Sequence, residues 1–191
     1  MKKLEVSFFG KNAIIVARKL IGCFLCRKIG RKIMRYKIVE TEAYEGVNDK
    51  ASHASRGETA RNKVMFGPSG RWYVYFTYGM HYMLNIVCGR KGYPAAVLIR
   101  GIIGEEGEKI IGPARLTKKF NVDKSFNGKK ASRETRLWIE AHTSKTHDRR
   151  FLMYGKKLKI MKTPRIGVDY SGPIWSNKLY RFVLKEFETK K

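Results

Sequence analysis

The sequence WYVYFTYGMHYMLNIVC, residues 72–88, places two runs rich in aromatic and β-branched residues on either side of Gly79. Runs of this composition favour β-strands. Gly79 can adopt the positive φ that a tight turn requires. The stretch therefore predicts a β-hairpin with strands over residues 72–77 and 81–88.

The register of this hairpin brings aromatic and amide side chains to one face. With the turn centred on Gly79, Tyr75 lies opposite Met83 and Tyr73 lies opposite Asn85. All four side chains then share a face, so an aromatic surface and an amide lie together. The inference depends on the register, because a slip of one residue moves every side chain to the other face.

Tyr78 occupies the predicted hairpin tip, where tight turns favour Asn, Asp or Gly. An aromatic at such a tip is expected to be exposed to solvent. In a strongly basic protein, an exposed aromatic on a protruding tip is typical of a wedge that enters a base stack. The alternative is a tyrosine that folds back onto the sheet, for instance against Trp72.

The flanking sequence predicts further strands and a few helices. In the first predicted helix Ile14, Ala17 and Ile21 fall on one stripe, and Gly22 lies where a helix would end. Pro113 is typical of a first helical position. Around the hairpin we predict a helix over 12–21, strands over 23–28, 32–44 and 95–103, a helix from Gly112-Pro113, a turn at Asn127-Gly128, and late strands over 137–140, 157–161 and 180–184.

These closely spaced strands predict an α+β fold: a curved, mainly antiparallel β-sheet with a few flanking helices and a protruding β-hairpin. Neither an internal repeat nor a low-complexity linker divides the sequence, so residues 1–191 are expected to form a single domain. With 43% hydrophobic and 12% aromatic residues the chain can bury a core, which excludes full disorder.

The charge balance points to a polyanionic partner. Lys and Arg total 41 and Asp and Glu 16, which gives a formal net charge of +25. Such a charge favours nucleic acid over a merely solubilising surface. A membrane surface fits less well, because the sequence has no long basic amphipathic helix and no apolar run of roughly 18 residues. Residues 1–9 lack the apolar stretch of a secretory signal, so we expect an intracellular protein with no membrane association.

The three cysteines, Cys23, Cys26 and Cys88, are typical of a reducing compartment because their number is odd and low. Cys23 and Cys26 have the Cys-x-x-Cys spacing of zinc or redox sites, yet no second ligand pair is spaced for zinc. On a strand these two side chains point to opposite faces. Two core cysteines are therefore the preferred interpretation, and we expect neither a metal nor another cofactor.

Two glutamates continue an apolar strand face. If residues 32–44 form a strand, one face carries Met34, Tyr36, Ile38, Glu40, Glu42 and Tyr44. A carboxylate on a core-facing surface is costly unless it is paired or hydrogen-bonded. For Glu40 we prefer an ion pair with a basic residue or emergence at the strand end, whereas Glu42 is the candidate acid or base.

Residues 51–62 are polar, contain glycine and lack a strand period, which predicts a long loop of the kind that carries function. His53 in this loop is by itself uninformative. Together with His81 and Glu42 it could suggest a metal site. The three lack the i, i+4 spacing of a helical ligand pair, so the metal interpretation is disfavoured.

Several short motifs follow one another along the chain. They are residues 39–44 (VETEAY), His53, Arg61-Asn62 with Met65-Phe66, residues 73–80 leading to Asn85, residues 97–100 (VLIR) and residues 112–116 (GPARL). In this order and spacing they resemble the alkyladenine (3-methyladenine) DNA glycosylase family, the type that lacks a helix-hairpin-helix motif. The similarity runs from about residue 17 to residue 182.

The resemblance implies a monofunctional base-excision-repair DNA glycosylase. Such an enzyme acts as a monomer on double-stranded DNA and flips out damaged purines such as 3-methyladenine, 7-methylguanine, hypoxanthine and ethenoadenine. It hydrolyses the N-glycosidic bond with a Glu-activated water and leaves an abasic site. The compartment implied is the nucleus in a eukaryote, and the cytoplasm or nucleoid in a prokaryote.

The resemblance also implies a role for each matching residue. Glu42 would be the general base and Arg100 would help to hold the water, with both counted as catalytic. Tyr44, His53 and Tyr75 would sandwich the flipped base. Asn85 would clash with the 2-amino group of guanine. Tyr78 would fill the gap in the duplex, Met80 would flank and support the same hairpin, and Arg61 is expected among the DNA contacts.

Two other functions fit part of the sequence. A non-catalytic nucleic-acid-binding module would explain the charge equally well, although it would have no use for Glu42 on an apolar face. A metal-dependent nuclease would cut the backbone in an EDTA-sensitive reaction.

Overall fold

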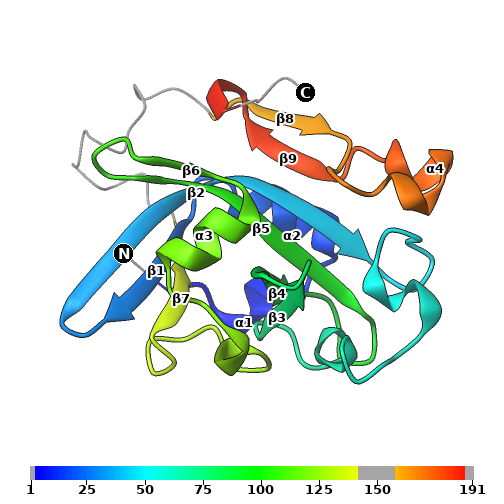
Figure 1. Ribbon diagram of the computed structural model, residues 1–191, viewed down its shortest axis with the longest axis horizontal. Helices are drawn as coiled ribbons and strands as arrows, with labels where there is room; N and C mark the ends of the chain where they lie inside the picture. Colours follow the sequence, from blue (N-terminus) through cyan, green and yellow to red (C-terminus); the bar gives the residue numbers. More distant parts are fainter. Residues whose placement is uncertain (1–2, 142–157, 188–191) are drawn as a thin grey trace.

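The computed structural model describes residues 3–141 and 158–187, which form one α+β domain (Figure 1). The strands are β1 (Phe24–Ile29), β2 (Lys32–Glu45), β3 (Trp72–Thr77), β4 (His81–Val87), β5 (Ala95–Gly104), β6 (Lys109–Ile111), β7 (Leu137–Glu140), β8 (Ile160–Thr163) and β9 (Arg181–Leu184). The helices are α1 (Val6–Phe9), α2 (Ala13–Leu20), α3 (Pro113–Lys119) and α4 (Pro173–Ser176). Short 3-10 helices are η1 (His53–Arg56), η2 (Lys63–Phe66), η3 (Lys124–Phe126), η4 (Asp169–Ser171) and η5 (Lys185–Phe187).

One sheet contains all of these strands, and its strand pairs are antiparallel, as predicted. The main path runs β3-β4-β5-β2-β1-β7, with β6 on β5 and the β8–β9 pair joined to β2. The long strand β2 pairs with β1 through residues 32–37 and with β9 through residues 40–42. This arrangement brings the C-terminal segment onto the part of β2 that carries Glu40 and Glu42.

Helices α2 and α3 lie on opposite faces of the sheet (Figure 1). Helix α2 begins where the Asn12 side chain accepts a hydrogen bond from the Ile15 N–H at 2.8 Å, a typical N-cap. On the other side of β2, Tyr36 packs edge-on against Phe120 just after α3. On the α2 side, the Thr41 hydroxyl donates to the Ala17 carbonyl at 3.0 Å, so β2 is buried on both faces.

The predicted elements are present with small shifts, and the β3–β4 register is the predicted one. Of the predicted stripe Ile14, Ala17 and Ile21, both Ala17 and Ile21 are buried, although Ile21 follows the last residue of α2. Ile14 is only partly buried, and the helix buries Ala13, Val16 and Leu20 as well. The late strand predicted over 157–161 is β8, which begins three residues later; Lys157 itself lies outside the described residues. The short elements α1, α4 and β6 were not predicted.

The cysteines are core residues, as predicted. Cys23 belongs to the main apolar core, while Cys26 packs with Phe24 and Trp138 in a separate cluster. All three cysteines are buried, and none of them forms a disulfide. Burial raises the pKa of the Cys26 thiol to about 12, with Glu140 adding to the shift, so this thiol stays protonated at neutral pH.

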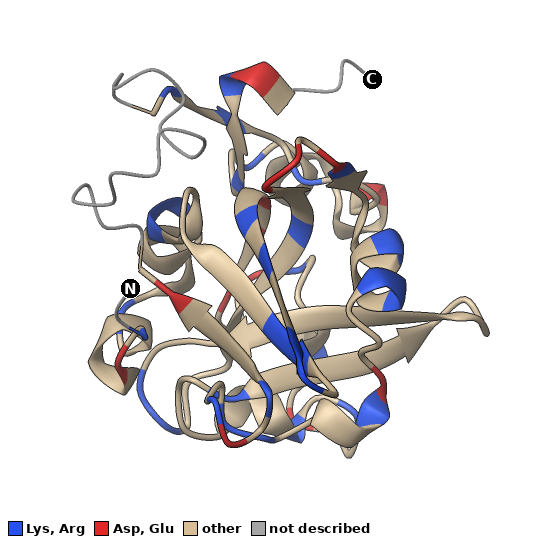
Figure 2. Cartoon of the chain, turned by 90° about the vertical axis from the view of Figure 1, so that its left-hand side faces the viewer, with Lys and Arg blue, Asp and Glu red and all other residues tan. Residues whose placement is uncertain are grey.

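Basic residues are distributed over strands, helices and loops, with few acidic residues between them (Figure 2). The same view shows the β3–β4 hairpin extending past the rest of the chain. Within the described residues, no helix has the length and apolarity needed to cross a membrane.

Candidate active site

A cavity of about 930 Å³ opens beside the β3–β4 hairpin. The hairpin face that carries Tyr73, Tyr75, Met83 and Asn85 forms one wall, as the register predicted. The loop that follows β2 and residues 166–171 complete the enclosure. Segments far apart in the sequence therefore meet around one space large enough for a nucleobase.

The loop after β2 is held in place by apolar packing and by one asparagine. Ala54 and Met65 pack with Tyr73 in a small core of their own. The buried Asn62 amide donates to the carbonyls of His53 and Gly57 at 2.8 and 2.9 Å. Its oxygen accepts the Thr59 N–H at 2.7 Å. These contacts fix the backbone on both sides of η1 and thereby the position of His53.

Glu42 is fully buried, and three groups surround its carboxylate. Oε1 accepts the Ile166 N–H at 2.8 Å and lies 3.4 Å from Arg100 Nε, and Oε2 accepts the Tyr44 hydroxyl at 3.0 Å. Ile166, Arg100 and Tyr44 all line the cavity, so the carboxylate lies against its wall without an exposed surface. Burial raises the pKa of Glu42 above the ordinary 4.5, and Arg100, the Ile166 N–H and Tyr44 oppose that rise.

Glu40 forms the structural ion pair that the sequence analysis preferred for it. Its Oε1 accepts from Arg181 Nε at 2.6 Å and from Arg100 Nε at 3.1 Å. Gly101 permits this close packing, because a Cβ there would lie 2.9 Å from the Glu40 Cβ. Burial disfavours the charge of Arg100, but Glu42 and Glu40 outweigh it and raise the Arg100 pKa. Arg100 therefore remains a cation at the cavity wall.

Aromatic rings line the cavity next to the Glu42–Arg100 pair. His53 packs edge-on against Tyr75, with ring centroids 4.6 Å apart, and its Nδ1 lies 2.9 Å from the Tyr73 hydroxyl. Burial, followed by the charge of Arg61, lowers the pKa of His53, so the imidazole is neutral at pH 7. Burial raises the pKa of Tyr75 to about 12 and that of Tyr44 well above 10. The aromatic side chains that line the cavity are therefore uncharged at neutral pH.

Asn85 lines the cavity with a side chain that also bonds to the hairpin backbone. Its Nδ2 donates to the Tyr73 carbonyl at 3.1 Å and, more weakly, to the Met83 carbonyl at 3.4 Å. The side chain is buried, with 2% of its surface exposed. Asn85 therefore stabilises the hairpin in addition to lining the cavity.

The hairpin tip is apolar and exposed. Tyr78 is 83% exposed and Met80 68%, so Tyr78 does not fold back onto Trp72. Tyr78 has a φ of 53°, a left-handed conformation that is unfavourable for a side chain of this size. Arg61 lies behind the tip, where it donates to the Phe76 carbonyl at 3.1 Å and lies 5.3 Å from the Tyr75 ring centroid.

Sequence reasoning missed four residues at this site. The side chains of Asp49 and Arg165 form a fully buried ion pair next to Tyr44. The Ile166 N–H binds Glu42, and the exposed Tyr170, which lines the cavity, donates to the Ala51 carbonyl at 2.9 Å. The scarcity of acidic residues could have directed attention to Asp49. His81 lies away from the cavity wall, and among the described residues no three His, Cys, Asp or Glu side chains are grouped to hold a metal ion.

A basic α+β domain with a buried carboxylate beside an arginine and an aromatic cavity of nucleobase size has the features of an enzyme that acts on DNA bases. The family model described as "Methylpurine-DNA glycosylase (MPG)" matches residues 7–188. The chain belongs to this family and is a DNA glycosylase.

Curated relatives from distant organisms match most of the chain. A protein of Methanocella arvoryzae is 40% identical over 187 residues, which cover 90% of this chain and 88% of the relative. One from Legionella pneumophila (strain Corby) is 37% identical, covering 97% and 96%. One from Carboxydothermus hydrogenoformans is 38% identical, covering 95% of each. All three are provisionally named 3-methyladenine DNA glycosylase.

Proposed function

We propose that this protein is a monofunctional glycosylase that removes alkylated or deaminated purines from double-stranded DNA. Its substrates would include 3-methyladenine, 7-methylguanine, hypoxanthine and ethenoadenine, and its product would be an abasic site. The Glu42 carboxylate carries the proposal, because its three partners all line the aromatic cavity. The provisional names of the relatives agree with the substrate class.

In the proposed reaction Glu42 activates a water that attacks C1′ of the flipped nucleotide. The C1′–N bond breaks, the purine leaves with the bonding electron pair, and Glu42 takes the proton of the water as the C1′–O bond forms. A carboxylate also stabilises the oxocarbenium-like transition state of such a hydrolysis. Because Glu42 has no exposed surface, one of the groups around it, Tyr44, Arg100 or the backbone at Ile166, has to move to admit the water.

The aromatic wall would select the base. Tyr44, His53 and Tyr75 supply ring surfaces and no charge, so an electron-poor, cationic alkylated purine stacks between them better than a normal purine. Tyr78, on the exposed tip, would occupy the place that the flipped nucleotide leaves in the duplex. Arg61 and other exposed cations would contact phosphates.

An abasic-site assay tests the proposal. A duplex oligonucleotide with one hypoxanthine or ethenoadenine should break at that position only after alkali treatment, and the free base should be released. Binding without base release would instead support the non-catalytic module. Cleavage without alkali that EDTA abolishes would support the nuclease.

The affinity for undamaged duplex should depend steeply on salt, given the formal charge of +25. With about four phosphate contacts, counterion release predicts roughly a tenfold loss of affinity for each doubling of salt. Arg71 and Lys118 are candidates for these contacts. Lys119 is less available because Glu108 pairs with it at 2.7 Å. A flat plot of log affinity against log salt would contradict the assignment of the charge to DNA.

Asn85→Ala should relax the exclusion of guanine. Removal of the amide widens the cavity, so excision of undamaged guanine should become measurable while excision of hypoxanthine, which lacks a 2-amino group, persists. The loss of the hydrogen bond to the Tyr73 carbonyl should cost about 1 kcal/mol of stability. A thermal melt beside both excision assays separates the roles, since a purely structural Asn85 would lower both activities in proportion.

A further inference from the structure

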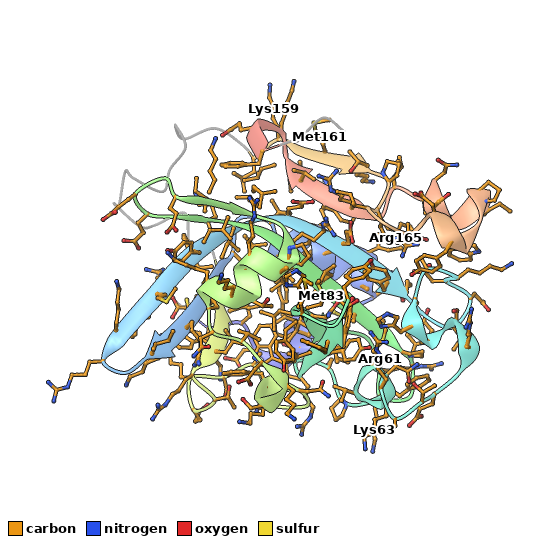
Figure 3. All side chains as sticks on the ribbon, viewed as in Figure 1. Arg61, Lys63, Met83, Lys159, Met161 and Arg165 are labelled. Carbon is orange, nitrogen blue, oxygen red and sulfur yellow. The ribbon has the colours of Figure 1, made fainter. Side chains whose placement is uncertain are left out.

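Asp49 and Arg165 form the one ion pair among the described residues in which both side chains are fully buried. The two terminal nitrogens of Arg165 donate to the two carboxylate oxygens of Asp49 at 2.5 and 2.8 Å. Asp49 belongs to the loop after β2, and Arg165 to the segment between β8 and η4. Figure 3 shows Arg165 where this segment meets the end of β2. Neither residue lines the cavity or has a part in the reaction proposed above.

Arg165 also donates to the Trp175 carbonyl and lies over the Tyr180 ring, and its other neighbours lie on both sides of Glu42. Ile166, the next residue in the chain, provides the N–H that binds Glu42 Oε1. The Arg165 guanidinium lies 4.9 Å from the ring centroid of Tyr44, whose hydroxyl binds Glu42 Oε2. Arg165 also donates to the Ala43 carbonyl at 2.9 Å, between Glu42 and Tyr44 in β2. Arg165 thus adjoins both neutral donors that bind the carboxylate.

Stability alone explains this pair poorly. Apolar residues of similar volume often replace a buried ion pair at no cost or with a gain in stability. The Arg165 Nε is also buried without a hydrogen-bond partner among the described residues, which adds a desolvation cost. A role in fixing geometry accounts for a charged pair at this position.

We propose that the Asp49–Arg165 pair positions Glu42 by clamping the Ile166 amide and the Tyr44 ring against its carboxylate. Asp49 anchors Arg165, and Arg165 anchors the two donors; neither residue touches the substrate. This inference rests on the proposed role of Glu42 as general base.

The clamp has a consequence for the pH at which Glu42 works. The charged and titratable groups that influence Glu42 are Arg100 on β5, Glu40 and Tyr44 on β2, Tyr75 on β3, and Arg165 and Tyr170 in the C-terminal segment. Loss of the clamp loosens the Ile166 and Tyr44 hydrogen bonds, and both bonds favour the ionised carboxylate. The pKa of Glu42 then rises further, so the acidic limb of the rate profile moves to higher pH.

Two variants test the clamp. The double variant Asp49→Leu with Arg165→Met removes the pair without leaving a buried charge, and Arg165→Lys keeps the charge but loses the two-pronged contact. The single-turnover rate on a hypoxanthine duplex is measured against pH for each. In both variants the midpoint of the acidic limb should rise by about one pH unit. At a pH below both midpoints, the rate of each variant should then be roughly tenfold lower than that of the wild type.

Glu140→Gln is the matched control for a general loss of stability. Glu140 is also a buried carboxylate that pairs with arginines, the exposed Arg133 at 2.8 Å and the partly buried Arg35 at 3.3 Å, but it lies on β7 at the far edge of the sheet. Its loss should lower the melting temperature and leave the midpoint of the limb unchanged.

An unchanged midpoint in a folded double variant would overturn the clamp, and where that variant does not fold, Arg165→Lys decides by the same criterion. Glu42→Gln separates this failure from failure of the proposed function. If Glu42→Gln keeps the wild-type rate and acidic limb, the general base is wrongly assigned. If Glu42→Gln abolishes the reaction but the clamp variants keep the wild-type limb, only the clamp is wrong.

Discussion

Glu42→Gln is expected to lower the single-turnover rate of base excision by roughly 10²–10⁴-fold through the loss of general base catalysis alone. The loss of negative charge near the oxocarbenium-like transition state should add to this effect. Glutamine keeps the shape of the side chain and can accept the Ile166 N–H, so binding of lesion-containing duplex should survive. Quench-flow excision and a gel-shift titration on the same duplex measure the two properties.

Two other carboxylates serve as comparisons. Glu108→Gln changes an exposed glutamate that pairs with Lys119, and it should leave excision unchanged. Glu40→Gln leaves Arg181 without its buried carboxylate partner, so stability should fall and excision should decrease through Arg100, but by less than in Glu42→Gln. A near-normal rate in Glu42→Gln, or an equal loss in Glu40→Gln, would contradict the assignment of Glu42.

Because the pKa of Glu42 is raised in the folded protein, Glu42→Gln should also gain stability while it loses activity. The base acts only when ionised, so wild-type activity should fall on an acidic limb above the ordinary value of 4.5. For stability, a carboxyl whose pKa is higher in the folded state contributes stability at low pH and loses it as pH rises through the folded pKa. Glu42→Gln should therefore gain melting temperature relative to wild type as pH increases. A difference in melting temperature that does not change with pH would contradict the raised pKa.

The sequence predicts those parts of the site that depend on local periodicity. The two-residue repeat of a strand and one turn glycine determine the β3–β4 register, which places Tyr73, Tyr75 and Asn85 on one wall. The same repeat in β2 puts Glu42 and Tyr44 on one side. Each of these inferences needs only neighbours a few residues apart.

The remainder of the site depends on contacts between distant segments. Arg165 and Asp49 are 116 residues apart, and Arg181 and Glu40 are 141 apart, so no local pattern pairs them. The donor from Ile166 is a backbone N–H, which its side chain does not reveal. The elements α1 and α4 have only four residues each, too few for a helical period to be recognised.

The exposed tyrosine at the hairpin tip is the second position where we expect a large effect. Tyr78 is 83% exposed and has a φ of 53°, while Gly79 next to it has a φ of 66°. A tyrosine in the left-handed region costs on the order of 1–2 kcal/mol, which asparagine or glycine would largely avoid. Neither the core nor the turn accounts for this residue, so a contact with a partner outside the fold explains it better.

Tyr78→Ala should lower the excision of a base-paired lesion about a hundredfold and leave the fold intact. Flipping costs a few kcal/mol of unstacking, and a wedge that fills the gap offsets that cost; each 1.4 kcal/mol corresponds to a factor of ten. Ethenoadenine fluorescence in the duplex should change less in the variant, because less of the base is extrahelical. Tyr78→Phe keeps the ring and should keep most of the activity. Tyr78→Asn suits the left-handed backbone better but lacks the ring, so its activity on the paired lesion should still fall.

The decisive comparison is between double- and single-stranded substrates. A single-stranded lesion requires little unstacking, so Tyr78→Ala should reduce its excision far less than that of the paired lesion. Met80→Ala, which changes the neighbouring exposed side chain at the same tip, shows whether any loss of apolar surface there has this effect. If Tyr78→Ala lowers both activities in equal proportion along with the melting temperature, Tyr78 is a structural residue. A selective loss on duplex at an unchanged melting temperature is what a side chain that replaces the flipped nucleotide requires.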